Sequence, residues 1–146
     1  MIGKGFYFLE KASSGNELSE YHLEAGIASL HCAAPSYEAT DWKQIVELYD
    51  SLYRLNPSPV VALNRAVAIA NAKGPEAGLS ELSKIPASDK LKTYPFYPAA
   101  YGEFYLLAGQ PAEAAQHFEK ALKLARTESE KNFFGGKLEA SRSGND

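Results

Sequence analysis

Four side chains that are able to bind a metal ion lie close together early in the sequence: His22, Glu24, His31 and Cys32. Zinc requires ligands that converge on one point. On a helix, the nine residues from His22 to His31 turn the chain by about 900°, which places these two side chains half a turn out of phase. Glu24 and Cys32 do not correct this mismatch. The sequence therefore predicts no metal site, and assigns these side chains to the surface or to packing between helices, with a hydrogen-bonded, buried His31 as the alternative.

Motifs for catalysis or cofactor binding are not recognisable either. A nucleophilic enzyme holds a base against a serine or cysteine and orients that base with a third group. The glycine pattern of a nucleophile elbow does not occur. The pair Gly135-Gly136 lacks the Lys-Ser/Thr and the preceding strand of a phosphate-binding loop. We therefore predict a binding protein with no catalytic residues and no cofactor, rather than an enzyme.

The polar pair Asn64-Arg65 interrupts an otherwise apolar stretch. Polar side chains inside a protein generally need hydrogen-bond partners. One interpretation is a structural ion pair, from Arg65 to Asp41, Glu38 or Asp50. The other is a polar anchor in a concave groove that holds a partner peptide. Asn64, Arg65 and Asp41 are therefore candidate site residues under either interpretation.

An aromatic row occupies the middle of the second half of the sequence. Its members are Tyr94, Phe96, Tyr97, Tyr101, Phe104 and Tyr105. Their three- and four-residue steps are typical of one helix face, so most of these rings should belong to the core. The alternative is that some of the tyrosines line a groove, where a ring and a hydroxyl suit contacts with a peptide. Tyr97 is the first candidate for this role, and Tyr101 is the second.

The elements that position these residues are helices. Apolar residues recur at helical steps, as in Trp42, Ile45, Tyr49 and Leu52, and no segment alternates with a period of two for long enough to indicate a strand. Caps and breakers mark the boundaries. Helices are predicted over 2–12, 18–34, 41–55, 59–73, 75–85, 96–108, 111–125 and 128–141, with a loop over 86–95.

The composition is that of one ordinary globular domain, which we place at residues 1–142, with a disordered tail at 143–146. Of the 146 residues, 45% are hydrophobic and 23% are charged. The net charge of −3 and the lack of any Lys/Arg run argue against direct DNA binding. No apolar run reaches the ~18–20 residues of a membrane helix, so no membrane contact is expected. The single cysteine cannot form an internal disulfide, which favours a cytoplasmic location.

The helices also repeat. Residues 98–126 match a tetratricopeptide repeat at Tyr101-Gly102, Tyr105, Gly109, Ala114, Phe118 and Ala121. In such a repeat Gly102 and Ala114 let the two helices of a pair approach, while Tyr105 and Phe118 fill the gap towards the neighbouring pair. Degenerate copies cover 42–57 and 59–85, the second of which keeps Ala77. Their spacing of 32 and 37 residues brackets the ~34 of this unit. The sequence thus predicts an all-α, right-handed solenoid of degenerate helical hairpins, with about eight helices.

Three strings and a short closing motif carry a closer resemblance. They are Tyr21–His31, Thr40–Tyr49, Pro57–Ala68 (PSPVVALNRAVA) and Gly74–Leu79. From about residue 3 to residue 138 the chain resembles the tetratricopeptide-like C-terminal extension of bacterial extracytoplasmic-function sigma factors. The string Pro57–Ala68 is the most specific of the three. The sequence departs from the family pattern at Gly26 and at Gly135-Gly136.

This resemblance implies a regulatory protein-interaction domain of an RNA polymerase sigma factor, which acts in transcription initiation. In that family, two preceding helical regions bind core RNA polymerase and promoter DNA, and we expect this chain to lack both. The implied partners are the N-terminal regions of the sigma factor, core RNA polymerase, or a small protein with a DGPF motif, because genes for such proteins often neighbour those of the family. The alternative is a stand-alone tetratricopeptide scaffold that binds an unrelated protein.

Overall fold

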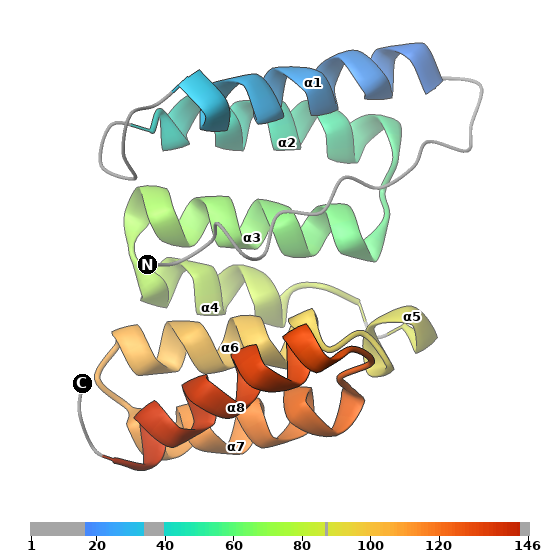
Figure 1. The fold of residues 1–146 in the computed structure, drawn as a ribbon. Coiled ribbons are helices and arrows are strands. Elements are labelled where there is room, and N and C mark those ends of the chain that lie inside the picture. Colours follow the sequence, from blue (N-terminus) through green and yellow to red (C-terminus); the bar gives the residue numbers. More distant parts are fainter. Residues whose placement is uncertain (1–16, 34–39, 87, 144–146) are drawn as a thin grey trace.

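The structure is a computed structural model that describes residues 17–33, 40–86 and 88–143. All regular elements in these ranges are α-helices, which confirms the predicted all-α class (Figure 1). They are α1 (Glu17–Ala33), α2 (Trp42–Leu55), α3 (Pro59–Lys73), α4 (Pro75–Ser83), α5 (Asp89–Lys92), α6 (Phe96–Leu107), α7 (Pro111–Leu124) and α8 (Glu128–Arg142). Within the described ranges no helix is both long and apolar enough to cross a bilayer.

Local hydrogen bonds explain where several helices begin. The Ser58 hydroxyl accepts a hydrogen bond from the backbone N–H of Val60 at 3.1 Å, directly before the proline that opens α3. The Thr127 hydroxyl accepts one from the N–H of Glu130 at 3.0 Å at the start of α8. Gly74 separates α3 from α4 with a φ of 110°, in a region that favours glycine. These caps confirm the predicted boundaries of α3 and the predicted start of α8.

The helices pack mainly against their neighbours in the chain, in a stack with α1 at one end and α7 at the other (Figure 1). Helix α1 packs on α2, α2 on α3, and α3 on α4. Helix α4 then packs on α6, α6 on α7, and α7 on α8. One core cluster joins α1, α2 and α3, and the other joins α3, α4, α6, α7 and α8. Because α3 is in both clusters, it is apolar around most of its circumference, as Val61, Ala66 and Ala68 show.

Two glycines lie where neighbouring helices approach each other closely. A Cβ atom on Gly102 of α6 would lie 2.9 Å from the ring of Phe118 on α7, which confirms the predicted role of Gly102. Phe118 itself is fully buried against Gly102, inside its own helix pair, rather than only filling the gap towards the next pair. In the preceding pair the close approach is at Gly78, where an added Cβ would lie 2.6 Å from Ala70 Cβ. The expected Ala77 is only half-buried.

Other boundaries differ from the sequence prediction. The predicted loop 86–95 contains the short helix α5, because the Ser88 hydroxyl accepts a hydrogen bond from the N–H of Leu91 at 3.2 Å and so caps a helical turn. The predicted helix 75–85 ends earlier, at Ser83. The predicted helix 2–12 and most of the predicted tail, residues 144–146, lie outside the described residues.

Candidate functional site

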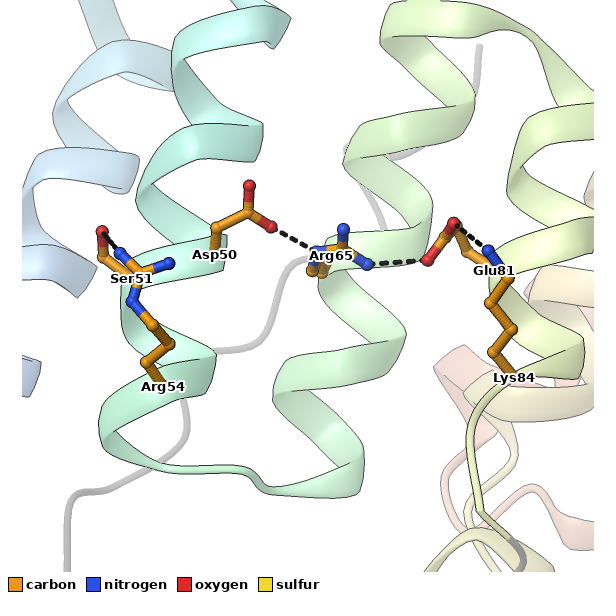
Figure 2. A network of polar contacts seen from close by, with 6 residues as sticks. All are labelled: Asp50, Ser51, Arg54, Arg65, Glu81 and Lys84. Atoms are coloured by element: carbon orange, nitrogen blue, oxygen red, sulfur yellow. Dashed lines mark hydrogen bonds and ion pairs between the residues drawn. The ribbon is translucent and has the colours of Figure 1, made fainter.

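Arg65 joins three helices. From α3, its Nε donates a hydrogen bond to Asp50 Oδ1 on α2 at 2.5 Å, and its Nη1 donates one to Glu81 Oε1 on α4 at 2.7 Å (Figure 2). Lys84 Nζ donates to the other Glu81 oxygen at 3.1 Å. The Arg65 side chain is 30% exposed, so this bridge lies at the edge of the core. Asp50 is therefore confirmed as a partner of Arg65, and Glu81 is a second partner that the sequence did not predict.

The other residues grouped with Arg65 have different positions. Asp41 is exposed and caps α2, where its carboxylate accepts a hydrogen bond from the N–H of Gln44 at 3.1 Å. The expected ion pair between Asp41 and Arg65 is wrong, because Arg65 faces Asp50 and Glu81 instead. Asn64 is 3% exposed and lies in the interior beside the core face of α3, rather than in an open groove. The third proposed partner, Glu38, lies outside the described residues.

Loss of the Arg65 bridge should have a moderate cost. Arg65→Ala is expected to lower the free energy of unfolding by about 1–2 kcal/mol, which is between the cost for a surface pair and that for a buried one. Urea denaturation at neutral pH measures this. Arg54→Ala is a matched control, because Arg54 is exposed and donates to Ser51 on its own helix at 3.0 Å. The control should change stability by no more than ~0.5 kcal/mol, and equal losses in both variants would contradict the bridge.

The same bridge should weaken in acid. Burial alone would raise the pKa of Glu81, but hydrogen bonds and charges from Arg65 and Lys84 outweigh burial and hold this pKa below its ordinary 4.5. A carboxyl whose pKa is lower in the folded chain than in the unfolded chain stabilises the fold above its unfolded pKa. It loses this contribution as the pH falls through its folded pKa. The stability difference between wild type and Arg65→Ala should therefore narrow as the pH falls below 4.5.

A more deeply buried ion pair lies between α6 and α8. Lys137 Nζ donates hydrogen bonds to both oxygens of Glu103, at 2.9 and 2.8 Å. Glu103 is 3% exposed and Lys137 is 26% exposed. Lys137 Nζ also lies 5.8 Å from the centre of the Phe133 ring. This pair is not among the sequence predictions, although a lone glutamate within the apolar sequence of α6 indicates a buried acid that needs a cation.

A pocket of about 480 Å³ lies between α5, α6 and α7. Two α6 tyrosines, Tyr97 and Tyr101, line it, which is closer to the groove alternative for these rings than to a purely core position. Helix α7 supplies His117, Lys120 and Lys123 at three-residue steps, and none of these three residues was a predicted site residue. The remaining lining residues are Leu91, Lys92, Pro98 and Leu124. Of the other aromatic residues, Phe104 is fully buried in the core.

The aromatic rings of this pocket form an ordered group. The Tyr97 ring meets the Tyr101 ring edge-on, with centroids 5.4 Å apart and an interplanar angle of 82°. Tyr101 stacks on His117 at 5.0 Å and 17°, and Tyr105 stacks on the same imidazole at 5.4 Å and 15°. This stacking fixes the orientation of the rings that face the pocket.

Burial shifts the pKa values of two of these side chains, His117 and Tyr101. Burial, and secondarily the Lys120 ammonium, lower the pKa of His117 from its ordinary 6.5, while Glu113 acts in the opposite direction. Burial, together with a side-chain hydrogen bond to Tyr97, raises the pKa of Tyr101. Because its pKa is lowered, the His117 imidazole is uncharged at neutral pH, and the charged residues that line the pocket are Lys92, Lys120 and Lys123.

The residues considered for metal binding do not form a site in the part of the chain that the structure describes. There, no group of three or more His, Cys, Asp or Glu side chains is arranged to hold an ion. On α1, His22 is exposed and Glu24 is buried. The side chains of His31 and Cys32 are not among those described, so the expectation that they do not bind metal stays a prediction.

No family model matches the chain. The chain is 39% identical, over 130 residues, to an uncharacterized protein of Rhizobium meliloti (strain 1021). The aligned stretch is 89% of this chain but 30% of that relative. The chain therefore spans less than a third of the length of the curated relative that it matches.

Proposed function

We propose that this chain is a regulatory protein-interaction domain of an extracytoplasmic-function sigma factor, and that it acts in the bacterial cytoplasm. The observation that carries the proposal is the packing order, in which helices contact mainly their neighbours along the chain. Repeat proteins have this order, and their outer faces stay open to partners because little chain folds back over them.

We propose that the helices form a right-handed array of tetratricopeptide-like hairpins, and two details of packing support the hairpins. Gly102 and Ala114 lie where the α6–α7 pair needs small residues, and Ala114 is fully buried. Gly78 provides an equivalent close approach for the α3–α4 pair. Degenerate repeats of this kind commonly serve as scaffolds for protein partners.

The sigma-factor assignment is supported by the string Pro57–Ala68, which forms the start and centre of α3. It is also compatible with the length of the Rhizobium relative, 70% of which lies outside the aligned stretch. In such a protein the remaining length has room for regions that bind core RNA polymerase and promoter DNA. The proposed partners of this domain are those N-terminal sigma regions, core RNA polymerase or a small DGPF-motif protein.

A binding experiment separates this function from that of a stand-alone scaffold. The chain would be immobilised and titrated with purified core RNA polymerase. Separate titrations would use the two N-terminal regions of an extracytoplasmic-function sigma factor and a small DGPF-motif protein, both from the same genome. We expect saturable binding to at least one of them, at micromolar concentration or below. Promoter DNA is the negative control, because eighteen acidic and fifteen basic residues are interspersed along the chain. If none of the three proteins binds, the sigma-factor proposal fails and the scaffold alternative is favoured.

A further inference from the structure

The pocket between α5, α6 and α7 has the size and lining of a site for a small molecule. Pockets that bind small ligands usually enclose ~300–1,000 Å³ and combine apolar walls with a few polar groups. This pocket, of about 480 Å³, is lined by Leu91, Pro98 and Leu124 and by the rings of Tyr97 and Tyr101. The uncharged imidazole of His117 adds a hydrogen-bonding group at the same wall.

The charges of the pocket have one sign. Lys92, Lys120 and Lys123 contribute ammonium groups, and no carboxylate is among the lining residues. Lys92 lies 3.5 Å from Asp89, which partly offsets its charge. Lys120 and Lys123 are exposed and form no ion pair within the described part of the chain. The pocket is therefore complementary to an anion, and its strongest attraction comes from α7.

The position of these lysines on α7 favours a singly charged anion over a doubly charged one. Lys120 and Lys123 lie in the second half of α7, which ends at Leu124. The C-terminal end of a helix has a partial negative charge, which disfavours a doubly charged group such as a phosphate monoester. A singly charged carboxylate suits this position better. The flat rings and the prolyl and leucyl side chains of the wall suit a planar apolar body.

We propose that this pocket binds a small planar aromatic carboxylate. The ring of the ligand lies against Tyr97, Pro98 and Leu124, and its carboxylate faces Lys120 and Lys123. This gives the domain a ligand site in addition to any protein partner, and the proposal does not depend on which protein that partner is.

The test uses 2-naphthoate as the probe and follows the amide signals of the whole chain by NMR. We expect saturable shifts that are largest at residues lining the pocket. The uncharged analogue 2-naphthalenemethanol has the same rings, and it should bind at least about tenfold more weakly because it cannot pair with the lysines. No saturable shift with millimolar naphthoate, or equal binding of both compounds, would overturn the proposal.

Charge reversal tests the lysines directly. The double variant Lys120→Glu/Lys123→Glu should weaken naphthoate binding at least about tenfold. The matched control is Lys43→Glu/Lys131→Glu, which makes the same change in net charge at exposed positions on α2 and α8 outside the pocket. If both double variants weaken naphthoate binding equally, the change in net charge alone explains the loss, and the proposed site is refuted. An acidic, tryptophan-containing pentapeptide that displaces naphthoate and binds at least about tenfold more tightly would instead make the pocket a docking surface for a protein segment.

Discussion

Replacing Lys137 with methionine is expected to lower the free energy of unfolding by about 3 kcal/mol. Lys137 donates to both oxygens of Glu103, which is 3% exposed, so the substitution leaves a carboxylate inside the protein without its cation. Breaking a buried pair in this way usually costs ~3–5 kcal/mol. Lys137 is itself 26% exposed, which places the expected value at the lower end of that range. Urea denaturation of the whole chain at neutral pH measures the difference.

Two further variants show whether the cost comes from the stranded charge. Replacing both partners, as Glu103→Leu/Lys137→Met, should recover most of the lost stability, because a well-packed apolar pair often replaces a buried ion pair at little cost. Lys131→Met changes an exposed lysine of the same helix and should shift stability by no more than ~0.5 kcal/mol. If the double variant is as unstable as Lys137→Met, the stranded charge does not explain the loss. The loss would then come from the packing of the lysine stem.

Helix positions were predictable where local hydrogen bonds decide them. Ser58-Pro59 and Gly74-Pro75 act within one turn of the chain, so the bounds of α3 agree with the prediction. The short helix α5 was not predicted, because its local signal is ambiguous. Ser88 and Asp89 belong to residue types that form either turns or helix caps, and the sequence does not distinguish the two.

The partners of Arg65 show the limit of sequence reasoning for the polar residues. Asp50 was among the predicted partners, but so was Asp41, which caps α2 instead. A nearby backbone N–H is always within reach of a capping carboxylate, whereas a distant arginine is reached only if two helices pack in one register. That register also brings Glu81 from α4 to the other side of Arg65, and nothing in the spacing of residues along the chain indicates it.

The sequence indicates the α6 side of the pocket but not its α7 side. Tyr97 and Tyr101 stand out in the sequence because rings at four-residue steps are uncommon on a purely solvated face. His117, Lys120 and Lys123 also share one face, but exposed lysines at such steps are typical of any surface helix. Only the packing of α7 against α6 turns this face towards the tyrosines, as the stacking of His117 on Tyr101 shows.

Replacing glycines with alanine is expected to have the second large effect on the free energy of unfolding, and the direction of this effect depends on the position of the glycine. Gly78→Ala is expected to lower the free energy of unfolding by about 2–3 kcal/mol, because its new Cβ would lie 2.6 Å from Ala70 Cβ and 2.9 Å from the Phe104 ring. Ala70 has no longer side chain to rotate away, so α3 and α4 must separate. Gly102→Ala should cost about 1–3 kcal/mol, because the buried Phe118 ring lies 2.9 Å from the new atom. Thermal and urea denaturation measure both losses.

Gly135 and Gly136 are the matched controls, with the opposite expected result. Both lie inside α8, and at either position an added Cβ would meet no atom within 4 Å apart from its chain neighbours and the adjacent backbone of the same helix. Alanine there removes the entropic cost of glycine in a helix, so each substitution should stabilise the chain by about 0.5–1 kcal/mol. If all four substitutions destabilise equally, the close approaches at Gly78 and Gly102 do not limit the packing. If only these two are costly, small residues at the helix crossings are required, and the proposed hairpin repeats depend on such crossings.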